Sequence, residues 1–350
     1  MLMVHALLLM VVIQKVFNGG VMINQEVLDF FKESRVLVTG GTGLIGRPLV
    51  DMLVNAGAQV WVVSLDDLKP NSQAHYIKLD LRNNELAQSA TANMDYVFHL
   101  AGIKGSIEVT KSKPASFFVP YLQFNTNVLE ACRIQNVKRI VYTSSIGAYS
   151  SAEIFVENEI TDGVPMDMFP GWAKRMAEMQ IRSYKIQYGL KNFAVVRPCN
   201  VYGIGDNFDP ENAMVIPSLI HRIAEGENPV KIWGDGSAVR DFAYNVDCAE
   251  GILLAMYHMP DIDFLNLGSG IGYTIKELVE TLHSFIDFNY EWDTTKSNGF
   301  PKRVMDITNA KRLINFNPTT TLREGLEETW KWFLANRKEY LKRKNYFTER

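Results

Sequence analysis

The stretch "SRVLVTGGTGLIGRPLV", from Ser34 to Val50, decides the fold of this chain. It begins with a short apolar run rich in β-branched residues, which is typical of a buried strand. The run leads directly into glycines, and the residues from Gly46 onward have helical spacing up to Gly57. A strand that turns through glycines into a helix predicts the start of a parallel α/β sheet.

Three glycines, Gly40, Gly43 and Gly46, lie in that turn. The turn needs a residue without a Cβ atom, the backbone has to approach a pyrophosphate, and the helix has to pack tightly on the strand. The N-terminus of the helix then offers free N–H groups to phosphate. Since an acid follows about 20 residues later, the context predicts a dinucleotide site whose loop also includes Thr42, Leu44 and Ile45.

That acid is Asp66, at the end of the second predicted strand, with Asp67 as the less favoured choice. A carboxylate at this position accepts hydrogen bonds from the adenosine ribose hydroxyls and repels a 2′-phosphate. Lys69 is the only nearby cation in the sequence, and no arginine is placed to hold that phosphate. The sequence therefore predicts NAD rather than NADP as the cofactor.

Short, apolar, β-rich segments continue along the chain, and helical segments separate most of them. They are "QVWVVSLDD" (59–67), "AHYIKLDL" (74–81), "DYVFHLAG" (95–102), "RIVYTSS" (139–145) and "NFAVVRP" (192–198). This alternation predicts an α/β fold with a doubly wound parallel sheet of the Rossmann type, covered by helices on both faces.

After Pro198 the alternation loosens. We expect an NAD-binding domain over 22–200, with its sheet completed by 236–264. A smaller mixed α/β substrate lobe is expected from 201–235 and 265–350.

The composition sets limits on partners and compartment. The chain has 350 residues, 47% of them hydrophobic, and a net charge of −3, which gives no indication of a nucleic-acid partner. Its three cysteines, Cys132, Cys199 and Cys248, are far apart, which favours reduced thiols in the cytoplasm. No Cys/His spacing predicts a metal site.

The first 21 residues are apolar but too short to span a bilayer comfortably, and they lack the features of a secretory signal. We interpret them as a non-native or mis-assigned leader, with Met22 as the true start. The alternative is a membrane-surface anchor, but no membrane partner is expected.

The glycine spacing resembles the extended short-chain dehydrogenase/reductase family, and so do later motifs between about residues 34 and 335. "LDL", with Asp80 and Leu81, resembles the family's adenine-contacting segment. "FHLAG", with Leu100, Ala101 and Gly102, resembles the loop under the cofactor. "YTSSIGAYS" resembles the strand that carries the catalytic serine, which would be Ser145.

Within that family, three segments resemble the GDP-L-fucose synthase group of GDP-sugar enzymes. They are "AGIKGSIEVTKSKPASFFVPYLQFNTNVLEAC", "NVYGIGDNFDPENAMVIPSLIHRI" and "IWGDGSAVRDF". The resemblance implies a substrate site with Ser145, Asn200, Val215, Arg222, Trp233 and Arg240. Arginine suits bidentate phosphate recognition and tryptophan suits base stacking.

Hydride transfer at a carbinol carbon also moves a proton on and off the oxygen, so an acid/base must lie within reach. The resemblance implies a tyrosine four residues before a lysine. Lys174 matches the lysine, which also borders the cofactor, but the tyrosine position holds Pro170. Proline is tolerated in the first turn of a helix, so this departure fits the fold while removing the expected proton carrier.

Three interpretations of this site remain open. Tyr149, Lys174 with a lowered pKa, or a water held by Ser145 replaces the tyrosine in an active enzyme. Alternatively, the chain binds NAD and a GDP-sugar without turnover, as a sensor or partner subunit. Lys174 could also be only a solvated helix lysine.

Other departures narrow the reaction that the resemblance implies. Gly147 and Met214 stand where the fucose synthases carry their epimerising cysteine and histidine, and Ile146 and Gly147 replace the Asp–Glu pair of the dehydratases. The remaining expectation is redox chemistry at one carbon of a nucleotide sugar, at C4. Relatives commonly dimerise through two helices, here 116–135 and the one after Pro170, so a homodimer is expected.

Overall fold

The computed structural model describes residues 23–103, 105, 107–157, 163–209 and 211–340. The leader predicted for residues 1–21 lies outside these ranges.

A seven-stranded parallel sheet forms the centre of the first lobe, in the order β11-β7-β5-β4-β1-β2-β3. Its strands are β1 (Arg35–Thr39), β2 (Gln59–Ser64), β3 (His75–Lys78), β4 (Tyr96–His99), β5 (Arg139–Thr143), β7 (Phe193–Pro198) and β11 (Leu265–Leu267). The strand order reverses between β1 and β4, and in such sheets ligands bind at the carboxyl ends of the strands beside this point. The predicted doubly wound fold is confirmed.

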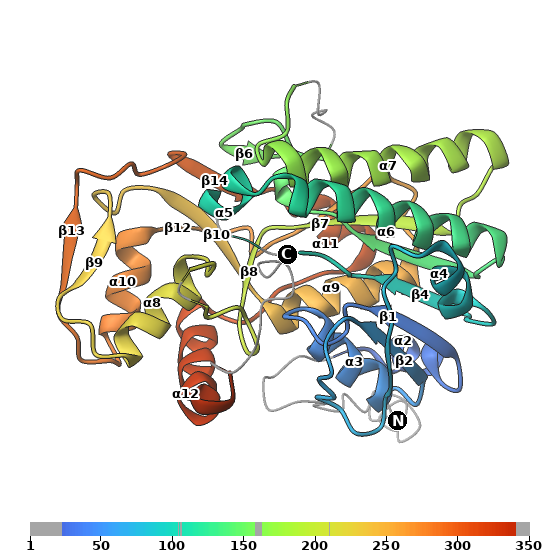
Figure 1. Ribbon diagram of the computed structural model, residues 1–350, viewed down its shortest axis with the longest axis horizontal. Helices are drawn as coiled ribbons and strands as arrows, with labels where there is room; N and C mark the ends of the chain where they lie inside the picture. The colour runs from blue at the N-terminus through green and yellow to red at the C-terminus, as the bar shows by residue number, and fades with distance from the viewer. Residues whose placement is uncertain (1–22, 104, 106, 158–162, 210, 341–350) are drawn as a thin grey trace, which may run out of the picture.

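Helices cover both faces of this sheet, as Figure 1 shows. On one face lie α4 (Asn84–Thr91), α6 (Ala115–Ile134) and α7 (Met168–Tyr188). On the other lie α2 (Gln25–Phe31), α3 (Gly46–Asn55), α9 (Asn245–His258) and α11 (Thr308–Ile314). The short α5 (Ile107–Ser112) and the 3-10 turn η1 (Ile146–Ala148) belong to the loops after β4 and β5.

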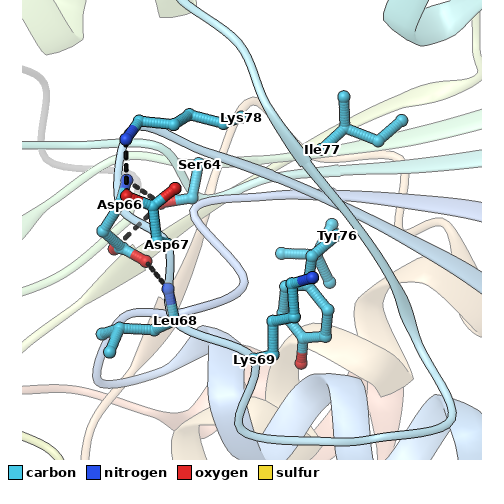
Figure 2. Close-up of a pocket in the computed structure, with 9 residues that line it drawn as sticks. Ser64, Asp66, Asp67, Leu68, Lys69, Tyr76, Ile77 and Lys78 are labelled. Atoms are coloured by element: carbon cyan, nitrogen blue, oxygen red, sulfur yellow. Dashed lines mark hydrogen bonds and ion pairs between the residues drawn. The ribbon is translucent and has the colours of Figure 1, made fainter.

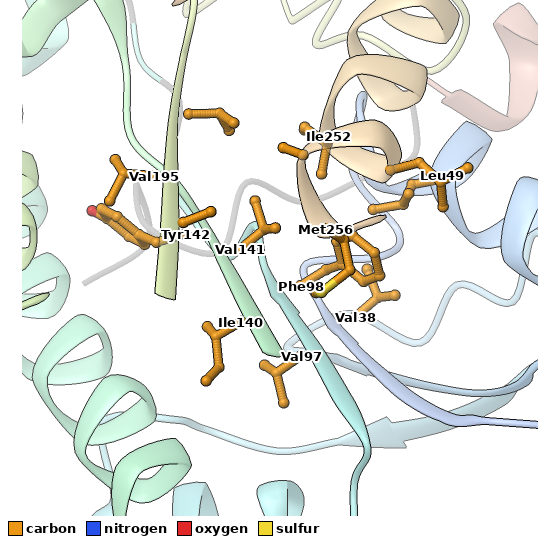
Figure 3. Close-up of a cluster of buried hydrophobic side chains, with 14 of the residues drawn as sticks. Val38, Leu49, Val97, Phe98, Ile140, Val141, Tyr142, Val195, Ile252 and Met256 are labelled. Carbon is orange, nitrogen blue, oxygen red and sulfur yellow. The ribbon is translucent and has the colours of Figure 1, made fainter. Parts of the chain in front are cut away.

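The main core lies between the sheet and these helices (Figure 3). Val38, Phe98 and Val141 come from adjacent strands and meet Leu49 of α3 and Met256 of α9. The central strands β1, β4, β5 and β7 are apolar on both faces because both faces are covered, so they lack the alternating pattern of a half-exposed sheet, whereas the edge strand β3 is mostly exposed.

The second lobe contains two smaller sheets and its own core. One sheet has the order β12-β10-β14-β6, with β8 paired to β10, and the other pairs β13 with β9. The strands are β6 (Ile154–Phe155), β8 (Asn200–Tyr202), β9 (Val230–Trp233), β10 (Val239–Tyr244), β12 (Gly272–Thr274), β13 (Tyr290–Asp293) and β14 (Lys302–Met305). The helices are α8 (Val215–Ala224), α10 (Ile275–His283) and α12 (Leu322–Tyr340).

The segment 236–264, expected to complete the first sheet, is shared between the lobes. It supplies β10 to the second lobe and α9 to a face of the first sheet. The seventh strand of that sheet is β11, directly after this segment, where it pairs with β7. The division at residues 200, 235 and 265 remains a prediction about domains.

Candidate active site

The glycine loop between β1 and α3 is shaped by close backbone approaches. Gly40 has φ +69°, and a Cβ there would lie 3.0 Å from the Cα of Ala101. A Cβ on Gly46 would lie 2.4 Å from the carbonyl oxygen of Gly40. A Cβ at Gly46 would displace the backbone, because real Cβ atoms essentially never approach other atoms so closely. At Gly40 the positive φ and the tight fit would strain any other residue.

The outer side of this loop fits a pyrophosphate. A Cβ on Gly43 would meet only the Gly40 carbonyl oxygen, at 3.2 Å, among the residues described. Helix α3 begins without a side-chain cap, so its N-terminus can bind an anion. The side chains of Arg47 and Asn245 hold the carbonyls of Thr42 and Leu44, at 2.8 and 2.9 Å.

Asp66 lies beside this loop, at the end of β2. Its carboxylate accepts hydrogen bonds from the hydroxyls of Thr42 at 2.7 Å and Ser64 at 3.0 Å, and from the backbone N–H of Leu68 at 2.9 Å. The carboxylate borders a pocket of about 180 Å³ (Figure 2). The position suits the ribose hydroxyls of a dinucleotide whose pyrophosphate is at the loop.

The pocket also contains cations that bear on a 2′-phosphate. Lys69 lines it, as expected, and so does Lys78, which sequence reasoning missed. Lys78 forms an ion pair with the exposed Asp67, at 2.6 Å. Lys78 is distant from Asp66 along the chain, and only the pairing of β3 with β2 brings it to the pocket, so the sequence did not indicate it.

The segments after β3 and β4 are both near the expected cofactor site. The backbone N–H groups of Leu100 and Ala101 donate to the carbonyl and hydroxyl of Thr39, at 3.2 and 3.1 Å, which holds the loop through Gly102 against β1. Asp80 is paired with Arg82 through both carboxylate oxygens, and Leu81 beside it is buried.

Lys174 is not a solvated helix lysine, because it is only 7% exposed. Its Nζ donates to the carbonyl of Thr143 at 2.6 Å and lies 5.0 and 5.1 Å from the ring centres of Tyr121 and Tyr142. Burial lowers its pKa to about 7, and Glu178 offsets part of that effect.

Ser145 lies at the end of β5, at the carboxyl edge of the sheet. Its hydroxyl accepts from the N–H of Gly147 at 3.1 Å and caps η1. Pro170 is in the first turn of α7, where the missing N–H has no helical partner to lose.

The structure argues against Tyr149 as the proton carrier. Its side chain is 3% exposed, and its hydroxyl donates to Asn266 at 2.8 Å. The guanidinium of Arg197 lies 4.3 Å from its ring centre. Asn266 belongs to β11, so this contact ties the Tyr149 hydroxyl to the core beside that strand. Burial also raises the pKa of Tyr149 above its ordinary value.

Two arginines lie side by side in the second lobe. Arg240 of β10 and Arg303 of β14 are register partners. Burial and the charge of Arg303 lower the pKa of Arg240 to about 10. A pair of desolvated guanidiniums suits a diphosphate. Arg303 was missed because only the strand pairing brings it to Arg240.

The other predicted substrate residues lie on different elements and contact different partners. Trp233 is exposed on β9, with the Nζ of Lys296 5.5 Å from its ring centre. Asn200 donates to the carbonyl of Asp241 at 3.0 Å, and Val215 opens α8. Arg222 binds Glu227 with two of its nitrogens, which competes with its predicted role as a diphosphate clamp.

Two further features concern metals and membranes. Within the described ranges, no group of three or more His, Cys, Asp or Glu side chains is arranged to hold a metal ion. No helix in the same ranges has the length and apolarity needed to cross a bilayer.

Residues 36–268, which contain the glycine loop, Asp66, Ser145 and Lys174, match the NAD dependent epimerase/dehydratase family. The chain belongs to this family, as its resemblance to the extended short-chain dehydrogenases/reductases predicted.

Particular relatives show how far the similarity extends. The chain is 31% identical over 319 residues to the probable GDP-L-fucose synthase 1 of Oryza sativa subsp. japonica, covering 87% of this chain and 93% of that one. It matches a UDP-glucose 4-epimerase of Thermotoga maritima, solved with UDP-glucose, at 29% identity and a TM-score of 0.77, over 86% of this chain and 99% of that one. An epimerase of Methanothermobacter thermautotrophicus shares the fold, with a TM-score of 0.82 at 24% identity, over 91% of this chain and 97% of that one.

Proposed function

We propose that this protein is an NAD-dependent oxidoreductase or epimerase that acts at one carbon, C4, of a nucleotide sugar, with a GDP-sugar favoured. The observation that carries the proposal is the position of Ser145 and the buried Lys174. Both lie at the carboxyl edge of the sheet that also holds the glycine loop and Asp66. Similarity to the rice GDP-L-fucose synthase supports the GDP preference, and similarity to a 4-epimerase supports C4.

The proposed cofactor is NAD. The carboxylate of Asp66 is placed to accept hydrogen bonds from ribose hydroxyls and to repel a 2′-phosphate. Lys69, and Lys78 in its ion pair with Asp67, are cations in the same pocket that would favour the 2′-phosphate of NADP. The bound dinucleotide supplies the hydride acceptor. The loop around Gly43 and the N-terminus of α3 hold its pyrophosphate, and Lys174 lies under the end of β5, where the substrate hydroxyl is expected.

The protein's own groups orient the sugar in this proposal. Arg240 and Arg303 hold the diphosphate, and Trp233 stacks on the base. In this proposal Ser145 hydrogen-bonds the reacting hydroxyl, and the N–H of Gly147 holds the serine oxygen at the edge of the sheet. The sugar's carbon is thereby held between the serine and the cofactor.

We also propose a homodimer in the cytoplasm. Exposed apolar side chains gather on the two adjacent helices α6 and α7, namely Val119, Ile134, Met168, Phe169, Met176, Met179, Ile186 and Tyr188. Burial of such a face against a second copy would remove it from water. The three cysteines are free and buried, in keeping with a reducing compartment.

The test is identification of the cofactor released from purified protein, combined with absorbance of the bound cofactor as nucleotide sugars are added. We expect NAD or NADH that changes redox state with a GDP-sugar, more readily than with the matching UDP-sugar. A cofactor that stays in one redox state with every GDP-, UDP- and dTDP-hexose would contradict the proposal and indicate binding without turnover.

A further inference from the structure

An unexpected carboxylate lies beside the candidate serine. A Cβ atom on Gly147 would lie 2.2 Å from Oδ2 of Asp167, so that carboxylate fills the space of a side chain at 147. Gly147 in turn donates its N–H to the hydroxyl of Ser145. The absence of a side chain at 147 therefore gives Asp167 access to the serine's surroundings.

Backbone hydrogen bonds fix Asp167 in this position. Its N–H donates to the carbonyl of Gly147 at 3.2 Å, and its own carbonyl accepts from Gly171 at 2.6 Å. One residue earlier, the N–H of Met166 donates to the carbonyl of Tyr149 at 2.7 Å. The start of α7 is thus tied to η1, and the Asp167 carboxylate is held where the two meet.

The carboxylate has the setting of an acid/base rather than of a structural cap. Asp167 occupies the N-cap position of α7, but its side chain makes no capping hydrogen bond. The residue as a whole is exposed, while its carboxylate packs against Gly147. Protein packed around the carboxylate raises its pKa above the ordinary value, and the Arg303 guanidinium partly opposes this rise.

The other candidates for the proton are less well placed. Pro170 carries no proton, and the hydroxyl of Tyr149 is bonded to Asn266 in the core. Lys174 is buried beneath two tyrosine rings with its Nζ on the carbonyl of Thr143. Asp167 combines an ionisable oxygen, an exposed position in the chain and a carboxylate placed against the serine's loop.

We propose that Asp167 is the catalytic residue that replaces the family's tyrosine, exchanging the proton of the sugar hydroxyl directly or through Ser145. This inference rests on the proposed function. In the oxidising direction the C–H hydride leaves for the nicotinamide, the O–H bond breaks and the carbonyl forms. The hydroxyl proton converts the Asp167 carboxylate to the acid, and in reduction the acid returns it.

The proposal has a definite pH dependence. Within the described part of the chain, Asp167 interacts electrostatically with Arg303 of β14 and Tyr121 of α6, and η1 carries no titratable side chain. Sugar oxidation needs the ionised carboxylate, so its rate should rise with pH through the raised pKa of Asp167. Reduction needs the acid and should fall over the same range.

The test compares Asp167→Asn with the wild-type protein and with Asp29→Asn, which changes an exposed aspartate of α2. Because the Asp167 side chain makes no capping hydrogen bond, its replacement by asparagine should leave α7 formed. We expect Asp167→Asn to bind NAD and GDP-mannose normally while single-turnover hydride transfer falls about 10²–10⁴-fold. Its rising pH limb should disappear, Asp167→Glu should restore part of the rate, and Asp29→Asn should match wild type.

A readout independent of rate is infrared difference spectroscopy of the bound cofactor–sugar complex. Formation of the ketone should produce a protonated carboxylic acid band in the wild type that is missing from Asp167→Asn. If Asp167→Asn keeps both hydride transfer and the rise of its rate with pH, Asp167 is not the proton carrier. The role would also be overturned if Asp167→Asn still transferred hydride and lost only the exchange of a hydrogen with solvent at a carbon beside the ketone. If wild type transfers no hydride, the proposed function itself fails.

Discussion

At the scale of single residues, the carboxylate of Asp66 accepts hydrogen bonds from three donors next to the glycine loop. Asp66→Asn removes the charge while keeping the size of the side chain. Hydrogen bonds to charged groups contribute about 1.5–3 kcal/mol, so we expect NAD affinity to fall about 10- to 150-fold. The control is Asp67→Asn, which lines the same pocket but is exposed and paired with Lys78. Isothermal titration calorimetry with NAD measures both affinities. A larger loss for Asp67→Asn than for Asp66→Asn would refute the role of Asp66 in binding the ribose.

Lys174 makes a second prediction at this scale. Lys174→Met keeps the apolar stem under the tyrosine rings but removes the ammonium. Because Lys174 borders the expected cofactor site, its loss should disturb the position of the cofactor and sugar, and we expect single-turnover reduction of bound NAD to slow about 10²-fold. Lys185→Met is a matched control, because this lysine of the same helix also donates to a carbonyl, at 3.1 Å from Ile262. Unchanged turnover in Lys174→Met would remove Lys174 from the mechanism.

The sequence identified some site residues better than others. Gly40, Gly46 and Asp66 could be predicted because a local strand–turn–helix pattern demands them, and Lys174 because it matches the family's lysine, four residues after Pro170. Tyr149 was misjudged because its nearness to Ser145 in sequence does not say that its ring turns into the core. Asp167 and Arg303 were missed because only tertiary pairing places them at the site.

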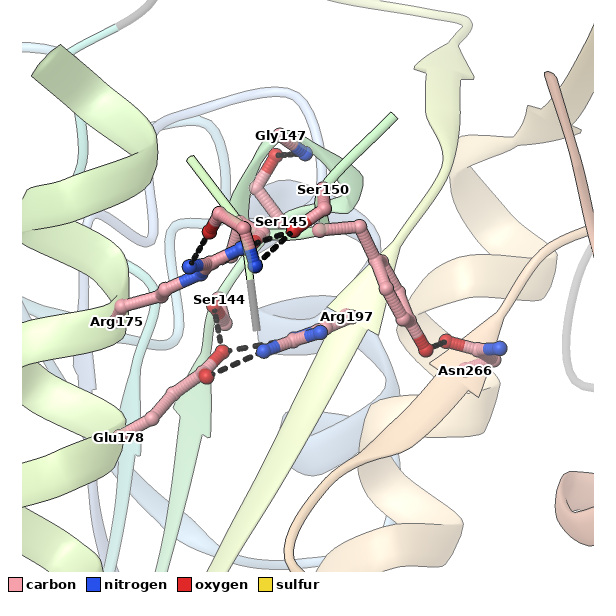
Figure 4. Close-up of polar contacts among 11 residues, drawn as sticks. Ser144, Ser145, Gly147, Ser150, Arg175, Glu178, Arg197 and Asn266 are labelled. Carbon is pink, nitrogen blue, oxygen red and sulfur yellow. Dashed lines mark hydrogen bonds and ion pairs between the residues drawn. The ribbon is translucent and has the colours of Figure 1, made fainter. Parts of the chain in front are cut away.

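At the scale of elements, a buried ion pair joins α7 to the sheet. Glu178 of α7 binds Arg197 of β7 through two bonds, of 2.9 and 2.5 Å, and accepts from the hydroxyl of Ser144 at 2.5 Å (Figure 4). Arg197 is fully buried. This pair helps to fix the helix that carries Lys174 and begins directly after Asp167.

Glu178→Gln should therefore be strongly destabilising, because it leaves the Arg197 charge buried and uncompensated. We expect the free energy of unfolding to fall by about 3–5 kcal/mol. Glu328→Gln breaks a surface pair with Lys331 and should cost less than about 1 kcal/mol. Urea denaturation of both variants gives the comparison, and equal losses would contradict the role given to the buried pair.

The central strands of the first sheet, β1, β4, β5 and β7, were predictable because they are largely apolar runs between turn residues. The seventh strand was not, because β11 has only three residues and is defined by its pairing with β7. Likewise, β10 resembles the earlier strands in sequence, yet it belongs to the second lobe.

At the scale of the whole molecule, the exposed apolar face of α6 and α7 predicts self-association. Ile186, on α7, is 77% exposed. A double variant, Met179→Glu with Ile186→Glu, should convert a dimer to a monomer in sedimentation equilibrium, since charges would be buried at the interface. Leu334→Glu, on the exposed surface of α12, should leave the dimer intact. A monomeric wild-type protein would contradict this prediction.

The two lobes together define the central claim, that a dinucleotide on the first and a nucleotide sugar on the second meet at Ser145. The direct test is a single-turnover experiment with GDP- and UDP-hexoses deuterated at C4, quenched and analysed by mass spectrometry of the released cofactor. Deuterium in the nicotinamide ring after mixing with a GDP-hexose is the predicted result. Deuterium that stays entirely on the sugar, with the cofactor unlabelled for every substrate, would contradict hydride transfer at C4.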